Sequence, residues 1–439
     1  MSQHPIRRFC AVLTAVAALA LCASAFAFTP PPFPRLAGIE TGGQANYNST
    51  SYQDALAKLS VVILKYWPGL TPGGESMQSI INAIHAKNPN TLVFFYTESD
   101  EGPASGGGAM APLYNEIRAM DWWLKVGSSL VPSFYGNGTD TINNTPYTPK
   151  NSSGYDSIDW ITHWYVNNYY KPNPAVNGFF MDNVFAKPRV TGDWYDNGTA
   201  LLPSNSKAAA ALQAGYERWF TLTHQLMSGK YQIGNAGSWA MPGATVPAGY
   251  VNMTNGATLE ALIGASYSTE SWAGWSAMMK EYDAVVSVTS APKLVVFNQW
   301  GSATDYQSMR YGLASCLMNN GYYSFTSNAS GYYGVVWFDE YNAKLGAAVG
   351  APPTSAWQKG VWRRDFIDGI ALVNPKGNGP QTVSLGGTFV KLKGTQAPGV
   401  NNGQTVTQVT LQNRDGIILM RKTPLVQPAS PGQVTVGTG

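Results

Sequence analysis

Eight short apolar segments, alternating with segments of helical period, constrain this fold more than any other feature. The apolar segments span residues 35–41, 60–67, 91–98, 178–182, 231–235, 257–262, 293–299 and 321–326. Helical periods lie between them, at 76–87, 114–125, 159–170, 206–228, 271–287 and 305–320. Continuous apolar strands separated by helices indicate a parallel sheet covered on both faces. Eight repeats favour a closed (β/α)8 TIM barrel over an open doubly wound sheet. Residues 126–134 could form a further strand, so the sequence alone does not fix the number of strands at eight.

The pattern changes after residue 350, where Pro352 and Pro353 begin what we interpret as a linker. Short runs separated by Gly, Pro and Asn then predict a small C-terminal all-β sandwich. These runs span 369–373, 381–385, 388–392, 405–411 and 416–420. We therefore expect a signal peptide at 1–27, a barrel at 28–350, a β-sandwich at 351–423 and a disordered tail at 424–439.

The N-terminus resembles a secretory signal peptide. Arg7 and Arg8 precede an apolar run that ends in an A-x-A pattern at Ala25 to Ala27. The run is short for a membrane span, and no later stretch of about 18 uninterrupted apolar residues follows, so we expect no membrane insertion. The expected location is secreted or periplasmic, with cleavage near Ala27. Cleavage would leave Cys316 alone, which excludes an intramolecular disulfide.

Composition excludes several classes of ligand. The net charge is +3 without basic or acidic blocks, so we expect no nucleic acid partner. Aromatic residues make up 12% of the chain, as many as the charged ones, and many lie beside Gly, Asn and Ser. Aromatic faces suit sugar rings, although a large core needs aromatic residues equally. The histidines retained after cleavage occur singly, which disfavours zinc. We expect no metal and no cofactor, while a loop-bound calcium ion stays open.

Polar residues at the ends of the apolar runs are the candidate site, because barrel chemistry gathers at the C-terminal ends of the strands. Asp182 and Glu260, on the fourth and sixth runs, form a candidate catalytic pair. Glycosidic bond hydrolysis needs two such carboxyl groups. The candidate substrate-binding residues are Lys65, Glu98, Asp100, Asn183, Asn235, Gln299 and Trp300. For Asp339 and Glu340, further on, we expect a structural role.

Each member of the pair has a structural alternative. Asp182 and Asn183 could cap a following helix or close an Asx turn. Glu260 lies between apolar neighbours and could form a buried salt bridge across the barrel. If these alternatives hold, the chain is a non-catalytic carbohydrate-binding protein in polysaccharide assembly or capture. Otherwise it is a glycoside hydrolase acting on a polysaccharide or oligosaccharide, expected to be monomeric.

Several stretches together resemble a known family. They are the Asp-Trp-Trp-Leu sequence at 121–124, a helical segment near 158–165, NGFFMDNV at 177–184, NGATLEALI at 255–263, GYYSF at 321–325 and RRDFIDGIALVNP at 363–375. The chain resembles glycoside-hydrolase-like family 15, a family of secreted bacterial proteins, over nearly all of its length after residue 27. The barrel part is more distantly similar to the endo-α-1,4-polygalactosaminidase family.

The distant resemblance implies roles for the pair. In that family the fourth strand carries a catalytic Asp within a G-[VIF]-F-[LM]-D pattern and the sixth carries a catalytic Glu, which correspond here to Asp182 and Glu260. Asp182 would then be the nucleophile and Glu260 the general acid/base of a retaining mechanism. Retention requires carboxyl groups about 5 to 5.5 Å apart, and inversion about 6.5 to 9.5 Å.

Overall fold

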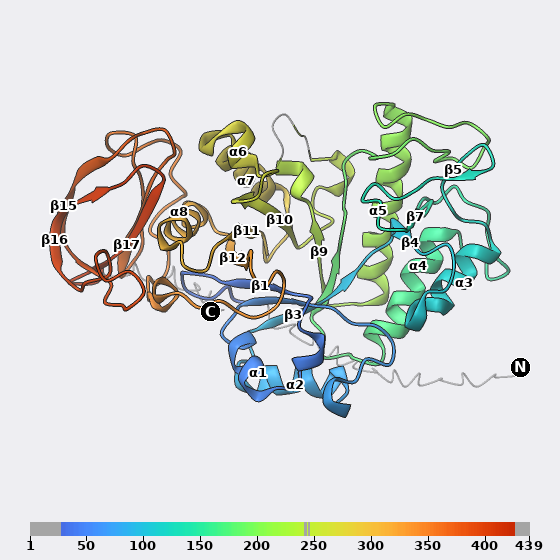
Figure 1. The fold of residues 1–439 in the computed structure, drawn as a ribbon, viewed down its shortest axis with the longest axis horizontal. Helices are drawn as coiled ribbons and strands as arrows, with labels where there is room; N and C mark the ends of the chain where they lie inside the picture. Colours follow the sequence, from blue (N-terminus) through green and yellow to red (C-terminus); the bar gives the residue numbers. More distant parts are fainter. Residues whose placement is uncertain (1–27, 241–243, 245, 426–439) are drawn as a thin grey trace, which may run out of the picture.

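A closed eight-stranded parallel barrel forms the larger part of the molecule (Figure 1). The computed structural model describes residues 28–240, 244 and 246–425. The expected signal peptide and most of the expected tail lie outside these residues. Each barrel strand pairs with the next in chain order: β1 (Ala37–Glu40), β2 (Val61–Leu64), β3 (Leu92–Thr97), β8 (Gly178–Met181), β9 (Tyr231–Asn235), β10 (Gly256–Ile263), β11 (Val296–Gly301) and β12 (Tyr322–Ser327). A parallel bridge between Leu36 and Tyr323 joins the last strand to the first, which confirms the predicted barrel.

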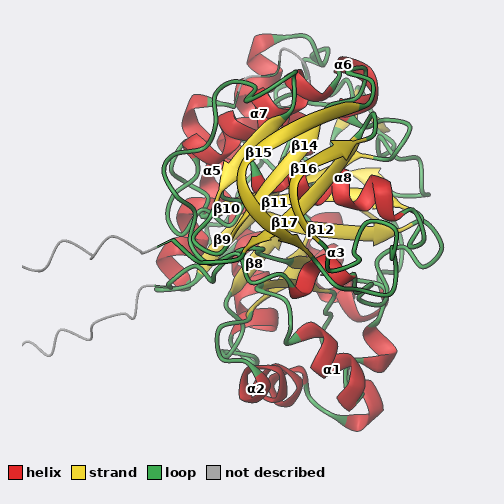
Figure 2. Cartoon of the chain, turned by 90° about the vertical axis from the view of Figure 1, so that its left-hand side faces the viewer, coloured by secondary structure: helices red, strands yellow, loops and turns green. Residues whose placement is uncertain are grey.

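Helices cover the outside of the barrel (Figure 2). They are α1 (Thr50–Leu56), α2 (Met77–Lys87), α3 (Ala111–Ala119), α4 (Ser157–Tyr165), α5 (Ser206–Leu226), α6 (Thr269–Ala273), α7 (Trp275–Val288) and α8 (Tyr306–Leu317). A π-helix, η4 (Val166–Tyr170), follows α4, and the 3-10 turns are Gln44–Asn46, Pro72–Gly74, Gly108–Met110, Gly237–Ala240, Ala248–Tyr250 and Asp339–Asn342. Side chains cap several N-termini: Ser76, Asp156, Asn205, Ser268 and Asp305 each accept a hydrogen bond from a backbone N–H of the first turn. None of the described helices is both long and apolar enough to cross a membrane.

The barrel strands are apolar throughout because both of their faces are buried. In β3, Phe94 belongs to the cluster that fills the barrel, whereas Val93 and Phe95 pack outward under the helices. The same alternation holds in β2, where Val61 and Ile63 point inward. A strand with two buried faces has no polar side to expose, and so the sequence shows runs rather than alternation.

The structure corrects the predicted elements at four places. The helix predicted at 114–125 ends at Ala119, because the chain turns at Asp121 (φ 55°) into a short hairpin, β5 (Lys125–Val126) and β6 (Ser129–Leu130), outside the barrel. A second small ribbon pairs β4 (Glu101–Gly102) with β7 (Asp140–Thr141). The helix predicted at 271–287 is broken at Gly274 (φ 81°). Helix α1 and strand β13 have no counterpart among the predicted elements.

The C-terminal β-domain is confirmed as a separate antiparallel sheet. Its strands are β13 (Trp362–Asp365), β14 (Gly369–Asn374), β15 (Gln381–Lys391), β16 (Thr405–Leu411) and β17 (Asp415–Arg421), in the order β13-β14-β17-β15-β16. The two runs predicted at 381–385 and 388–392 are one strand, whose pairing shifts between Ser384 and Phe389. One face of the sheet encloses a small core, and the other packs on α8, which explains why β14 is buried on both faces.

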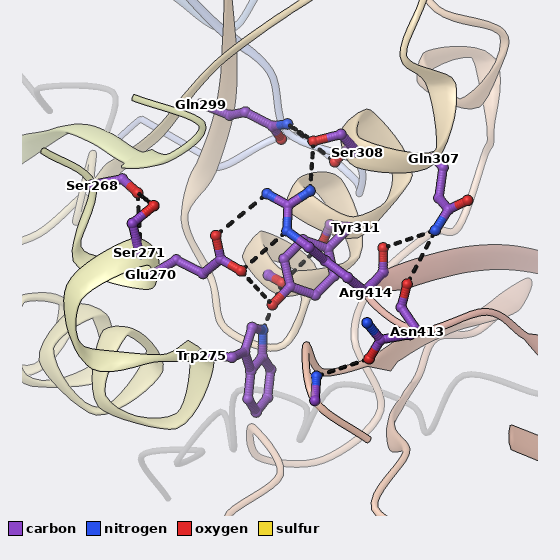
Figure 3. A network of polar contacts seen from close by, with 12 residues as sticks. Ser268, Glu270, Ser271, Trp275, Gln299, Gln307, Ser308, Tyr311, Asn413 and Arg414 are labelled. Carbon is purple, nitrogen blue, oxygen red and sulfur yellow. Dashed lines mark hydrogen bonds and ion pairs between the residues drawn. The ribbon is translucent and has the colours of Figure 1, made fainter. Parts of the chain in front are cut away.

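Polar contacts fix this sheet to the barrel (Figure 3). Arg414, in the turn before β17, forms an ion pair with the buried Glu270 of α6 and donates to Ser308 Oγ at 3.0 Å. On another side, Asp339 accepts the backbone N–H groups of 395 and 396, and Glu340 accepts from Asn401 Nδ2 at 2.8 Å. The carboxyl groups of Asp339 and Glu340 therefore have the structural role that we expected.

Candidate active site

Asp182 follows β8 directly and lies between the two neighbouring strands. Its Oδ2 accepts from Tyr96 Oη of β3 at 2.5 Å, and its Oδ1 accepts from Asn235 Nδ2 of β9 at 2.8 Å. The backbone N–H of Asn183 donates to Oδ1 at 2.8 Å. All three partners are donors, so they fix the position of the carboxyl group. The next α-helix, α5, begins only at Ser206 and is capped by Asn205, so Asp182 is not a helix cap.

Glu260 lies in a bulge of β10. The pairing of β10 with β11 shifts between Leu259 and Ile263, and Ala261 adopts a left-handed conformation (φ 53°). Asn298 of β11 stabilises the bulge, because its Oδ1 accepts the N–H of Ala261 at 3.0 Å. Bulges beside active sites re-aim a side chain, at a cost of about 1 kcal/mol for a left-handed Ala. Within the described residues no Lys or Arg forms an ion pair with Glu260, which removes its structural alternative.

The amide of Asn235 joins the two carboxyl groups. Its Nδ2 donates to Asp182 Oδ1 at 2.8 Å and to Glu260 Oε2 at 2.9 Å. These two oxygens therefore lie no further apart than the two distances laid end to end, about 5.7 Å. Tyr332, from the loop after β12, donates to the other oxygen of Glu260. The pair predicted from the strand ends thus meets in one place.

Burial and mutual repulsion shift the pKa values of several groups. Burial raises the pKa of Glu260, and the charge of Asp182 raises it further, while the hydrogen bonds from Tyr332 and Asn235 oppose the shift. The pKa of Glu98 is raised well above its usual value, first by burial and then by Asp100 and Asp182. Burial lowers the pKa of Lys65, against the opposing charges of Glu98 and Asp182. The raised pKa of Glu260 favours its protonated form.

A cleft of about 710 Å³ opens over the pair, within the range typical of ligand sites. Four aromatic side chains of its lining are about half exposed: Phe134 (51%), Tyr135 (47%), Tyr267 (48%) and Trp272 (55%). Large exposed aromatic rings around a polar floor are a surface on which sugar rings can stack. Arg189 lies on one wall, and its guanidinium is 5.0 Å from the Phe134 ring centre.

A smaller chamber of about 260 Å³ adjoins the cleft across Tyr96 and Glu98, which line both. Lys65 lines this chamber, with its ammonium 3.7 Å from the centre of the Tyr96 ring. Among the described residues, no hydrogen bond to the Lys65 ammonium is found. The rest of the chamber is mostly aromatic, including Tyr165 and Tyr169.

The structure places three of the seven predicted binding residues at the cleft and a fourth, Lys65, in the chamber. Asn183 accepts from Tyr135 Oη at 3.1 Å and donates to Glu98 at 3.4 Å and to Asp100 at 3.3 Å. Glu98, Asn183 and Asn235 line the cleft, and Lys65 lines the chamber. Asp100 contacts the site through Asn183 and does not line either cavity.

Two predicted binding residues lie elsewhere. Gln299 is fully buried on the outer face of β11, where its amide contacts Ser308 of α8 and accepts from Tyr323 Oη (Figure 3). Gln299 therefore does not reach the cleft, contrary to the prediction. Successive residues of a strand face opposite sides, and Gln299 faces the helices. Trp300, one residue on, faces inward, but it packs against the Tyr332 ring at 5.2 Å rather than lining the cleft.

Several site residues were not predicted. Tyr96 and Tyr332 donate to the two carboxyl groups. Glu40, at the end of β1, accepts from Gly334 in the loop that carries Tyr332. Tyr96 could have been predicted, because Phe94, Tyr96 and Glu98 occupy every second position along β3 and its end and therefore share one face. Tyr332 and three residues of the aromatic rim, Phe134, Tyr135 and Tyr267, lie on loops, where no periodicity identifies them, and the fourth, Trp272, lies on the short helix α6. No group of His, Cys, Asp and Glu side chains suited to a metal ion occurs in the described part of the chain.

Comparison with known proteins agrees with this geometry. Residues 85–370, more than half of the chain, match the family described as hypothetical glycosyl hydrolase family 15. The chain belongs to this family. Membership confirms the resemblance found in the sequence and the assignment to the glycoside hydrolases. No curated protein matches the chain.

Among solved structures the likenesses are distant. The glycoside hydrolase domain of PelA from Pseudomonas aeruginosa gives a TM-score of 0.42 at 11% identity and covers 70% of this chain and 99% of that one. The GH36 α-galactosidase AgaA from Geobacillus stearothermophilus gives 0.47 at 10%, covering 89% and 56%. The type III pullulan hydrolase from Thermococcus kodakarensis gives 0.47 at 12%, covering 86% and 71%. None of the three is similar enough to support an inference about the site.

Proposed function

We propose that this family member hydrolyses the glycosidic bonds of a polysaccharide with retention of anomeric configuration, using Asp182 as nucleophile and Glu260 as general acid/base. The observation that carries the proposal is the amide of Asn235, which holds the two carboxyl groups with facing oxygens at most about 5.7 Å apart. That spacing leaves too little room for the water that an inverting enzyme places between its carboxyl groups.

Each step follows from the environment of the two groups. Asp182, positioned by three donors, attacks the anomeric carbon as the carboxylate while Glu260 gives its proton to the departing oxygen. The bond to the leaving sugar breaks and an ester to Asp182 forms. Glu260, now a carboxylate, takes a proton from water as the water attacks the anomeric carbon, which releases the sugar and restores both groups. The raised pKa of Glu260 supports the acid role in the first step.

The lining of the cleft supports a neutral or amino-sugar polysaccharide. Glu98, Glu101, Asp182 and Glu260 line the cleft, against one cation, Arg189. With a single cation in its lining, the cleft offers little positive charge to bind a polyuronic chain. In the side chamber, the unpaired ammonium of Lys65 and the carboxyl group of Glu98 could contact the hydroxyl groups of a sugar, which both donate and accept hydrogen bonds.

The test is the release of reducing ends from neutral, uronic and amino-sugar polysaccharides. Wild type is compared with Asp182→Ala and Glu260→Gln, both checked for folding by circular dichroism. Activity lost in both variants would support the hydrolase. If wild type binds a polysaccharide without cleaving it, and binding falls when Trp272 is replaced by Ala, the carbohydrate-binding alternative holds.

We also propose that the protein acts outside the cytoplasm, on the strength of the signal-peptide pattern alone. In an expressing bacterium, the mature protein should be recovered from the periplasm or the medium with Phe28 at its N-terminus. An intact Met1 on the folded protein would contradict export.

A further inference from the structure

The loop after β12 brings Tyr332 to Glu260, and the rings of Tyr332 and Tyr333 pack on Trp300 and Tyr52. It leaves the strand through a tight turn, in which the N–H of Gly331 donates to Ser327 O at 2.8 Å. Tyr332 then contacts the ring of Trp300 edge to face and donates through Oη to Glu260. Loops held by few contacts open at low free energy, so the position of this hydroxyl depends on what ties the loop down.

The ties come from the end of β1, across the closure of the barrel. The backbone N–H of Gly42 donates to Tyr332 O at 2.9 Å. Two residues earlier, Glu40 is buried (5% exposed), and its Oε2 accepts both the N–H of Gly334 at 2.9 Å and Tyr52 Oη at 2.5 Å. Glu40 is therefore bonded to the loop on one side and to α1 on the other.

We propose that Glu40 is a positioning residue, which holds the 331–334 loop so that Tyr332 donates to Glu260. The inference rests on the proposed function only in the importance that it gives to Glu260. Burying a carboxyl group costs free energy unless hydrogen bonds compensate it, and here two donors bind one oxygen of Glu40. Without that acceptor, the N–H of Gly334 and the hydroxyl of Tyr52 lose their partner, and of the two bonds from the end of β1 to the loop only that from Gly42 to Tyr332 remains.

The expected consequence is a change in how readily Glu260 gives up its proton. The hydrogen bond from Tyr332 stabilises the ionised form of Glu260 and so lowers its pKa, against the effect of burial. Loss of a hydrogen bond to a charged group should raise this pKa by about one unit. Tyr332 donates to Glu260, so we expect a change seen on replacing Glu40 to pass through Tyr332.

The experiment measures the pKa of Glu260 directly, by NMR titration of full-length protein labelled with ¹³C at the glutamate carboxyl carbons. The resonance is assigned by its disappearance in Glu260→Gln. This readout needs no substrate, so it remains decisive if the protein proves not to be a hydrolase. Tyr332→Phe sets the scale, because it removes the donor and keeps the ring against Trp300.

Four further variants decide the point. Glu40→Asp, whose shorter side chain cannot reach Gly334, and Glu40→Met, which fills the space without an acceptor, should each raise the pKa of Glu260 as far as Tyr332→Phe does. Glu40→Gln keeps an oxygen at the same reach and should leave it near the wild-type value. Glu340→Met, which removes a buried carboxyl group that accepts from Asn401 of the C-terminal β-domain, should not change it.

The decisive outcome is the double variant. If Glu40 acts through Tyr332, Glu40→Asp should cause no further shift when it is added to Tyr332→Phe. The proposal is overturned if folded Glu40→Asp retains the wild-type pKa of Glu260, or if the two substitutions shift it additively.

Discussion

The two candidate catalytic groups sit at equivalent places in one barrel yet obtain their partners differently. Asp182 is held by Tyr96 and Asn235, which lie on β3 and β9, the strands that flank β8 in the sheet. Glu260 shares Asn235, but its second donor, Tyr332, comes from a loop after β12. The first environment follows from sheet register, whereas the second depends on a loop contact.

This difference matches the chemistry that we assign to the two groups. A nucleophile has to stay fixed, and two donors on neighbouring strands hold Asp182 in place. An acid/base has to change its charge twice in each turnover, so a partner on a loop suits it. If the proposed roles hold, sheet neighbours fix the nucleophile, and a loop adjusts the proton donor.

Replacing each of the two carboxyl groups in turn should have the largest effect on activity, and the products should tell the two groups apart. We expect Asp182→Ala to lower kcat at least about 10³-fold, because no covalent intermediate can form. Glu260→Ala should lower it by about 10²- to 10⁴-fold on an unactivated substrate. With a dinitrophenyl glycoside and azide, Asp182→Ala should yield the glycosyl azide of inverted configuration, and Glu260→Ala the retained one. A wild-type product of inverted configuration, observed by NMR, would contradict the assignment.

The shared residue, Asn235, gives the next largest effect. Asn235→Ala removes the donor between the two carboxyl groups, and loss of one such preorganised donor costs about 10²- to 10³-fold in kcat. Asn235→Asp has the same size but adds a third carboxyl group, so we expect it to be worse still. Steady-state kinetics on the best polysaccharide of the panel measures both. A variant Asn235→Ala that keeps a third of the activity would show that the bridge is not functional.

The sequence predicted the fold, and it predicted that the candidate pair and Asn235 lie together, for a physical reason. Each barrel strand is a continuous apolar run, so its end could be located to within a few residues, and with it Asp182, Asn235 and Glu260. The helices were less exact, since Gly274 and the turn at Asp121 break patterns that periodicity alone joins. The bulge at Ala261 left no clear signal, because it depends on a hydrogen bond to a residue of another strand, Asn298.

Side-chain direction explains the remaining errors. In β11 the inward face carries Asn298 and Trp300, so the residue between them, Gln299, must face the helices. Strict use of the two-residue period would have excluded it. No comparable rule could have identified Tyr332 or Glu40, whose contact joins the loop after the last strand to the end of the first strand. Contacts of this kind appear only once the barrel is closed.

The dependence of Glu260 on the end of β1 should also appear in protein stability. Burial raises the pKa of Glu40 to about 7 from an ordinary 4.5. Because the folded-state pKa is above the unfolded one, the protonated group stabilises the fold fully below about pH 4.5, and this stabilisation is lost as the pH rises through about 7. The shift corresponds to about 3 kcal/mol.

Urea unfolding of wild type and Glu40→Gln at several pH values tests this expectation. Between pH 4.5 and 8, the free energy of unfolding of wild type should fall by about 3 kcal/mol relative to Glu40→Gln, which has no titrating group at this position. The exposed carboxyl group of Glu75 supplies the control, since Glu75→Gln should follow wild type throughout. Parallel curves for wild type and Glu40→Gln would mean that Glu40 keeps one charge state over this range.

The aromatic rim gives the smallest effect and separates binding from chemistry. Tyr267 lies near Glu260 and exposes 48% of its surface in the cleft. Burial raises the pKa of Tyr267, and the charge of Glu260 raises it further. Stacking on one ring contributes about 0.5 to 1.5 kcal/mol, so Tyr267→Ala should raise KM by about two- to tenfold and leave kcat nearly unchanged. Tyr147, similarly exposed (43%) but outside the cleft, is the matched control, and Tyr147→Ala should change neither constant. A fall in kcat for Tyr267→Ala would instead mean that the ring positions the carboxyl group of Glu260. The position of Glu260 would then depend on two loops, those of Tyr332 and Tyr267, rather than on one.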